Sequence, residues 1–208
     1  MIFEQHNNLR GKHAFLSPSQ PQWLKYSKEQ LRQKRISSYS QPMGTSLHAL
    51  AETLIANGLK LKKGDKLTVL SHLLTDGIPR EVIDMDRIYN NLMTYVNDAI
   101  GFRLTPEQVL YYSDACFGTA DAVSFKNNLL RIHDYKSGVL PAKMEQLMVY
   151  AALFCLEYKV KPGEINMELR IYQSDEIIIC NPTAEDILPI MDVIIRDCKY
   201  VEEYSEEE

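Results

Sequence analysis

Residues 118–138 read GTADAVSFKNNLLRIHDYKSG, and this stretch decides the fold class. Residues 118–125 and 129–136 are rich in apolar and β-branched side chains, and Lys126-Asn127-Asn128 separates them. Two such runs on either side of a short polar turn predict a β-hairpin. We therefore expect two strands that pair side by side, each of which carries an aspartate.

The charged residues of this hairpin fall on faces that are otherwise apolar. Because side chains alternate along a strand, Asp134 and Lys136 share a face with Leu130 and Ile132. On the other strand, the same alternation groups Thr119, Asp121, Val123 and Phe125. A charge on an apolar face is costly unless it is compensated, and a cation between two close carboxylates is one remedy. The alternative is a structural Asp134–Lys136 ion pair at a strand end, which contributes little stability.

The segments around the hairpin alternate between strand and helix patterns. We expect a strand at 109–113 and a closing hairpin from 167–172 and 176–180, turning at Gln173-Ser174-Asp175. Helical spacing of apolar residues begins at Thr45 or Ser46 and recurs from Ile88 to Ala99. Further helices are expected from Pro141 to about Tyr158 and over 183–198. This alternation predicts an α/β fold.

Length and charge place the chain among ordinary globular domains. It has 208 residues, of which 45% are hydrophobic, and this is enough to form the core of one domain. The formal net charge is −5, but the first 63 residues carry ten lysines and arginines against three glutamates. A basic front half on an acidic chain favours a polyanion-facing surface, and solvated helix faces are the alternative.

The cysteines and apolar runs exclude several classes of protein. The four cysteines, Cys116, Cys155, Cys180 and Cys198, form no C-x-x-C pair, so neither a zinc site nor an iron–sulfur site is indicated. The first residues lack the basic region and long apolar run of a signal peptide. The longest apolar stretch, Met148–Leu156, is too short to span a bilayer. We expect a cytoplasmic protein with reduced thiols and no membrane contact.

Two further pairs of polar side chains have helical spacing. His48 and Glu52 are four residues apart at the edge of a leucine stripe, so the imidazole can turn toward a metal. A histidine in that position is also consistent with a surface or core-edge role. Gln146 and Tyr150 share a face of the helix that follows the lysine strand, where a hydrogen-bonded surface pair is the simpler interpretation.

Taken in order, these pieces resemble a known nuclease superfamily. The order is Gly44 to His48, Gly118 to Asp121, Asp134 to Gly138, and Gln146 to Tyr150. It is similar to G-x-x-x-H, G-x-x-D, D-x-K-[ST]-G and Q-x-x-x-Y of the RecB-like branch of the PD-(D/E)xK superfamily. The similarity covers about residues 44–158. Ala120 stands where the superfamily usually has proline, and the cysteine spacing differs from that of relatives with an iron–sulfur cluster, so we expect no cluster.

The resemblance implies a fold, a cofactor and residue roles. The fold would be restriction-endonuclease-like, a central mixed β-sheet flanked by helices with a helical N-terminal segment. His48, Asp121, Asp134 and the backbone carbonyl of Tyr135 would bind Mg²⁺ or Mn²⁺, which suits oxygen ligands with one imidazole. Lys136 would hold and polarise the attacking water, and Glu52 would orient His48 or a water. Gln146 and Tyr150 would position DNA or the lysine.

The basic N-terminal segment fits a DNA partner. Aromatic side chains at Trp23, Tyr26 and Tyr39 can stack on bases at a strand end. Alternatively, Trp23 and Leu24 dock this segment onto the core. The basic residues expected to contact phosphates are Arg10, Lys12, Lys25, Lys28, Arg32, Lys34 and Arg35.

The sequence therefore predicts a single nuclease domain over residues 1–200, followed by an acidic tail at 201–208. Residues 1–43 would form the basic arm and 44–200 the catalytic core. The expected activity is metal-dependent hydrolysis of DNA, with an exonuclease acting on linear ends favoured. The rivals are a structure-specific or nicking endonuclease with the same site, and a non-catalytic DNA-binding subunit. The resemblance also implies a bacterial or phage-encoded protein, and a homo-oligomer or a recombination protein as partner.

Overall fold

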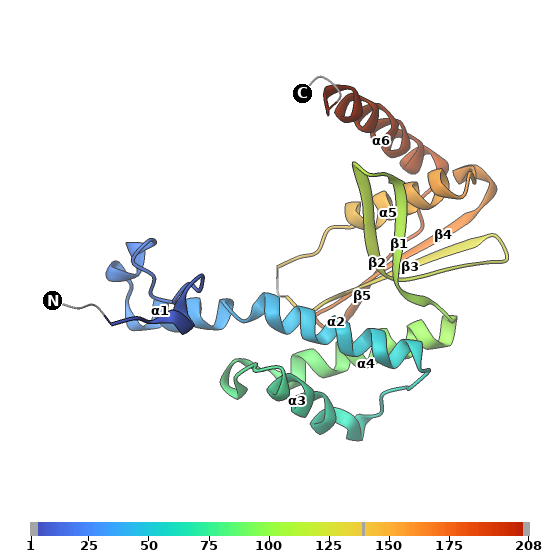
Figure 1. Ribbon diagram of the computed structural model, residues 1–208. Helices are drawn as coiled ribbons and strands as arrows, with labels where there is room; N and C mark the ends of the chain where they lie inside the picture. Colours follow the sequence, from blue (N-terminus) through green and yellow to red (C-terminus); the bar gives the residue numbers. More distant parts are fainter. Residues whose placement is uncertain (1–3, 139, 206–208) are drawn as a thin grey trace.

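The computed structural model describes residues 4–138 and 140–205 (Figure 1). In this part of the chain, five strands form one sheet in the order β1-β2-β3-β4-β5. β3 and β4 run parallel, whereas the other neighbours are antiparallel. The predicted α/β fold with a mixed sheet is confirmed. The strands are β1 (Thr105–Ser113), β2 (Cys116–Lys126), β3 (Leu129–Lys136), β4 (Asn166–Gln173) and β5 (Glu176–Cys180).

The β2–β3 hairpin forms as its sequence predicts. Its register runs from Ala122 opposite His133 to Lys126 opposite Leu129. Asn127 and Asn128 make the turn with φ values of 51° and 56°. Positive φ at both turn positions matches the right-handed twist of paired strands, and asparagine tolerates that conformation.

Helices cover both faces of the sheet and create two cores. The first core joins α2, α3 and α4 to one face, where Tyr135 and Tyr172 are fully buried. The second joins α5 and α6 to the other face, where Leu130 and Ile132 lie. None of the helices in the described ranges is long and apolar enough to cross a membrane. The helices are α1 (Lys28–Ser37), α2 (Ser40–Ala56), α3 (Lys66–Thr75), α4 (Met85–Phe102), α5 (Glu145–Glu157) and α6 (Ala184–Ser205).

Three predicted helix boundaries are wrong. α2 begins at Ser40, not at Thr45, because Pro42 lies in the first turn, where no backbone donor is needed. α5 begins at Glu145, not at Pro141, since the preceding residues form a loop. α6 continues to Ser205, so residues 201–205 are helical and do not form a separate tail. Residues 206–208 of the expected tail lie outside the described ranges.

The alternation of β2 breaks at Asp121. Ala120 and Val123 both pack in the core of α5 and α6, whereas Ala122 packs in the core of α2 to α4. Thr119, Asp121, Val123 and Phe125 therefore do not share a face, contrary to the prediction. On the neighbouring strand, Glu107 stands opposite this position with a φ of 48°, and the regular pairing of β1 with β2 omits it.

The N-terminal segment packs mainly on itself. A capping box between Ser27 and Gln30 starts α1. Trp23 donates its indole N–H to the carbonyl of Ser17 at 2.9 Å, and Leu24 is 70% exposed. The suggestion that Trp23 and Leu24 dock the arm onto the core is therefore wrong. Figure 1 shows this segment projecting from the N-terminal end of α2.

Candidate metal centre

Three adjacent strands bring three carboxylates to one level of the sheet. Gln108 pairs with Ala120 and Pro106 with Ala122, so Glu107 stands opposite Asp121. Ala122 pairs with His133, which sets Asp134 at the next position, also opposite Asp121. The regular ladder opens here, and Asp121 Oδ2 accepts the backbone N–H of Tyr135 at 2.8 Å. A side chain thus replaces a strand carbonyl at the point where the acids gather.

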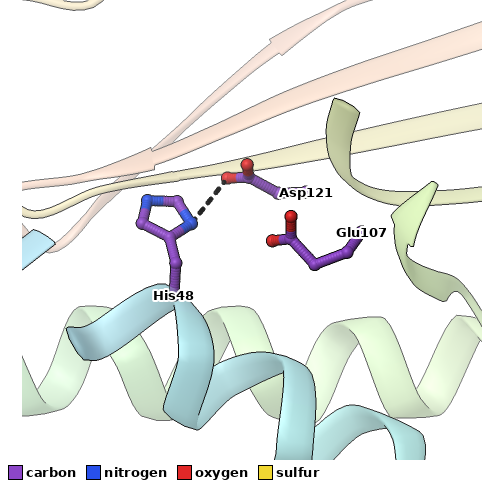
Figure 2. A group of neighbouring side chains, drawn as sticks. All are labelled: His48, Glu107 and Asp121. Carbon is purple, nitrogen blue, oxygen red and sulfur yellow. Dashed lines mark ion pairs between the residues drawn. The ribbon is translucent and has the colours of Figure 1, made fainter. Parts of the chain in front are cut away.

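α2 supplies a histidine to this group. His48 Nδ1 lies 3.4 Å from Asp121 Oδ2. Ligand atoms of His48, Glu107 and Asp121 all lie within 4.8 Å of one another, and Figure 2 shows the three side chains pointing toward a common centre. An open cleft of about 410 Å³ is lined by these three residues and by Thr45, Ala49 and Glu52. Glu52 therefore lies at the site, as the sequence predicts.

Asp134 and Lys136 enter from the side of α5. Lys136 Nζ donates to Asp134 Oδ1 at 2.9 Å and to Gln146 Oε1 at 3.2 Å. The second oxygen, Asp134 Oδ2, is buried and has no hydrogen-bond partner among the residues that the structure describes. Only 3% of Asp134 is exposed, so an unpaired oxygen there is costly.

Burial dominates the electrostatics of the site. It raises the pKa of Asp121 to about 6, although the Tyr135 amide and the Lys136 ammonium oppose the shift. Burial and the charge of Asp121 raise the pKa of Asp134 to about 6 as well. The pKa of Glu107 is also raised, by burial and by Asp121. At neutral pH the site therefore holds excess negative charge that a cation would relieve.

The imidazole of His48 is suited to metal binding. Burial lowers its pKa, so the ring is neutral near neutral pH and offers a free nitrogen lone pair. A hydrogen bond to the backbone of Tyr135 also acts on the ring. His48 and Tyr135 meet edge to face, with ring centroids 5.6 Å apart. The backbone of Tyr135 therefore lies beside the imidazole, at the position where the sequence predicts a carbonyl ligand.

Two residues that the sequence analysis missed hold the lysine strand in place. The Asn91 amide of α4 donates to the carbonyls of Lys136 and Tyr172, at 3.3 and 2.9 Å. Gln173 donates to the carbonyls of Gly138 and Leu140, both at 2.8 Å, and so fixes the loop that leads to α5. A polar residue on an apolar helix face was the available signal for Asn91.

Glu107 is the most important residue that the analysis missed. The expected strand began at Val109, because Pro106 marks a break, so the acid was placed outside the sheet. Once Thr105–Ser113 is known to be a strand, its pairing with β2 sets Glu107 opposite Asp121. An acidic residue within pairing reach of the predicted aspartate was the usable signal.

Tyr150 contacts β2, and its expected role toward DNA stays a prediction. Its hydroxyl donates to the carbonyl of Thr119 at 2.7 Å, and no hydrogen bond joins it to Lys136 in the described part of the chain. Its ring lies over Gly118, where an added Cβ would come within 3.0 Å of it. Tyr150 thus joins α5 to β2 and positions Asp121 indirectly. Gln146, in contrast, contacts the lysine itself.

The arm presents basic side chains away from the carboxylates. Arg35 is committed to two rings of the arm, with its guanidinium carbon 5.6 Å from the Phe15 ring centroid and 4.9 Å from that of Tyr39. Trp23 is half-buried within the arm. The structure does not bring these residues to the cleft, but it leaves a basic surface next to α2. The other basic residues expected to contact DNA are exposed, namely Arg10, Lys12, Lys25, Lys28, Arg32 and Lys34.

The donor set fits a divalent cation. The group offers carboxylate oxygens from Glu107 and Asp121 and one imidazole from His48. The unpartnered Oδ2 of Asp134 lies outside this group, on the strand next to Asp121. Mg²⁺ prefers oxygen ligands, and an imidazole among them favours Mn²⁺. The buried oxygen without a partner is the observation that distinguishes this group from an ordinary acidic patch.

Comparison with known proteins gave one match. A family model described as "Protein of unknown function (DUF2800)" matches residues 13–174. This range includes most of the arm, α2 with His48, and the three strands that carry Glu107, Asp121 and Asp134. No curated protein and no solved structure shows significant similarity to the chain.

Proposed function

We propose that this chain, which belongs to the DUF2800 family, is a metal-dependent nuclease that hydrolyses phosphodiester bonds in DNA. One observation carries the proposal. A buried carboxylate oxygen of Asp134 lacks a partner beside a second buried acid, and a lysine binds the other oxygen of Asp134. A site that gathers carboxylates, an imidazole and an ammonium suits a cation and a phosphate together.

The four candidate ligands would bind Mg²⁺ or Mn²⁺ from two sides. His48, Glu107 and Asp121 already lie close together and face an open cleft, where a cation can enter from solvent. Asp134 contributes its free oxygen from the other side. When bound, a divalent cation supplies Lewis-acid polarisation of the scissile phosphate and neutralises charge on it. Glu52 and Glu107 add negative potential at the cleft and thereby strengthen cation binding.

Lys136 is the residue that we assign to the reacting phosphate. The ammonium is anchored to Asp134, and 31% of the Lys136 side chain is exposed, so the residue is still accessible. A fixed positive charge stabilises the negative charge that develops on phosphate oxygens as water attacks phosphorus. Gln146 accepts from the same ammonium and holds it in orientation. Asn91 and Gln173 fix the backbone around it.

The basic arm supports DNA as the substrate. Exposed lysines and arginines bind phosphates without regard to sequence, and this binding weakens as salt rises. The arm joins α2 directly, only about two turns of helix before His48, so bound DNA would lie near the cleft. We further propose that linear ends are the preferred substrate, as in the exonucleases that the sequence resembles.

Labelled linear DNA incubated with Mg²⁺ or Mn²⁺ tests the proposal. We expect progressive shortening that EDTA prevents, and sparing of closed circular DNA of the same sequence. Cleavage of the closed circle would instead favour an endonuclease with the same site. Intact DNA in both metals, with folded protein, would contradict the nuclease proposal, and DNA binding without turnover would favour a non-catalytic subunit.

A further inference from the structure

Between the metal centre and the turn that joins β1 to β2, one face of the β1–β2 ribbon is uncovered. Leu110 and Ala120 point toward α5 and are buried, whereas the alternate residues on the other face are exposed. Glu107 and Asp121 begin this exposed face. Beyond them it carries Val109 at 46% exposure, Tyr111 at 43% and Phe117 at 61%, with Thr119 between.

The two aromatic residues form a continuous platform. Tyr111 pairs directly with Phe117 across the strands, and their ring centroids are 6.3 Å apart with planes inclined by 30°. Val109 lies between the rings and Glu107. At about 3.3 Å per residue, Tyr111 is roughly 13 Å along the strand from Glu107, the length of about four stacked nucleotides.

We propose that this aromatic strip, formed by Val109, Tyr111 and Phe117, is a stacking subsite for the unpaired strand of a nucleic acid whose phosphate lies at the metal centre. The proposal rests on the proposed nuclease function and adds a substrate class to it. Unpaired bases present their faces to aromatic rings, whereas paired bases in a duplex are already stacked on one another. The strip would therefore select single-stranded substrates or frayed ends.

The charges around the strip favour bases over phosphates as its ligands. The hydroxyl of Tyr111 donates to Asp114 Oδ1 at 3.0 Å, and the backbone N–H of Tyr111 donates to Glu157 Oε2 at 2.9 Å. The carboxylates of Asp114, at the ring hydroxyl, and of Glu157, at the backbone, repel phosphates, so a strand would bind here through its bases. The basic arm is the surface that suits the phosphates. A cross-strand aromatic pair also stabilises a hairpin, so the test must separate binding from stability.

Binding measured in EDTA separates the strip from catalysis. The probes are a fluorescein-labelled oligothymidylate and a labelled blunt hairpin duplex, followed by fluorescence anisotropy. We expect Tyr111→Ala with Phe117→Ala to weaken oligothymidylate binding roughly tenfold or more and to leave duplex binding unchanged. The exchange Tyr111→Phe with Phe117→Tyr keeps both rings and should restore affinity. Phe125→Ala is the matched control, since Phe125 is exposed on the same strand but packs against Phe154 on the opposite face.

Salt dependence gives a second readout that a loss of stability would not change. The double alanine variant should keep the wild-type slope of affinity against salt, because stacking releases no counterions. Lys34→Ala should make that slope shallower. A thermal unfolding curve for each variant, recorded without DNA, shows whether the ribbon remains folded.

Three results would overturn the proposal. They are wild-type affinity in the double variant, an equal loss for both probes, and a self-association of the wild-type protein that the double variant abolishes while DNA binding persists. Failure of the nuclease proposal gives a different pattern. In that case the wild-type protein binds oligothymidylate through the strip in EDTA but does not shorten it with Mn²⁺.

Discussion

Replacing Asp121 with asparagine should make the metal-free protein more stable at neutral pH. The carboxylate is destabilised by burial, since only 16% of its side chain is exposed, and its pKa is raised from 3.8 to about 6. Asparagine has the same shape, and its carbonyl oxygen can still accept the N–H of Tyr135. The substitution therefore removes a buried charge and keeps the local hydrogen bond.

The size of the effect follows from the pKa. A shift from 3.8 to about 6 corresponds to ~3 kcal/mol of preference for the protonated form in the folded state. The folded protein holds this proton more tightly than the unfolded chain does. The contribution of Asp121 to stability is therefore most favourable below pH 3.8 and declines as the pH rises to about 6. The stability gained by Asp121→Asn should rise over the same range, from near zero to at most ~3 kcal/mol.

Urea unfolding in EDTA, followed by circular dichroism between pH 4 and pH 8, measures this difference. In a thermal unfolding experiment at neutral pH, the same upper bound of ~3 kcal/mol corresponds to a rise in melting temperature of roughly 6–12 °C for a chain of this size. Asp192→Asn is the control, because Asp192 is exposed on α6. An Asp121→Asn protein no more stable than wild type at any pH would refute the argument that burial strains this carboxylate.

Four other predictions follow from the same geometry. Lys136→Ala and Asp134→Ala should each abolish metal-dependent cleavage while the circular dichroism spectrum stays folded, and a wild-type rate in either would refute the assigned roles. Glu107→Gln should weaken Mn²⁺ binding roughly tenfold or more by calorimetry, and an unchanged Kd would remove it from the ligand set. Mn²⁺ should raise the melting temperature more at pH 8 than at pH 5, because protons compete for two carboxyl groups with pKa about 6; the reverse order would contradict their role. Gly118→Ala should lower stability by about 1–3 kcal/mol, since the new Cβ meets the Tyr150 ring at 3.0 Å, and an unchanged melting temperature would show that this contact is not needed.

The hairpin that carries both aspartates could be predicted because its signals are local. Two β-prone runs and an Asn127-Asn128 turn specify the pairing without help from distant residues. The strand Leu129–Lys136 has the predicted bounds. The same locality explains why the final hairpin was predictable.

The missed features depend on contacts between distant segments. The break in alternation at Asp121 lies opposite the left-handed backbone of Glu107 on another strand, which the sequence of β2 does not encode. Asn91 and Gln173 act on backbone carbonyls 45 and 35 residues away, respectively. The position of Tyr150 depends on how closely α5 approaches β2 at Gly118. Residue spacing and the resemblance to the nuclease superfamily therefore indicated candidate ligands on two strands and one helix, but not Glu107 on the third strand.

The central claim is that His48, Glu107, Asp121 and Asp134 bind one divalent cation. The most direct measurement is anomalous scattering from a crystal of the protein soaked in Mn²⁺. The account predicts a strong peak in the cleft, with the histidine nitrogen and at least two of the carboxylates as ligands. A well-ordered cleft without such a peak, or a Mn²⁺ ion bound only elsewhere, would contradict it.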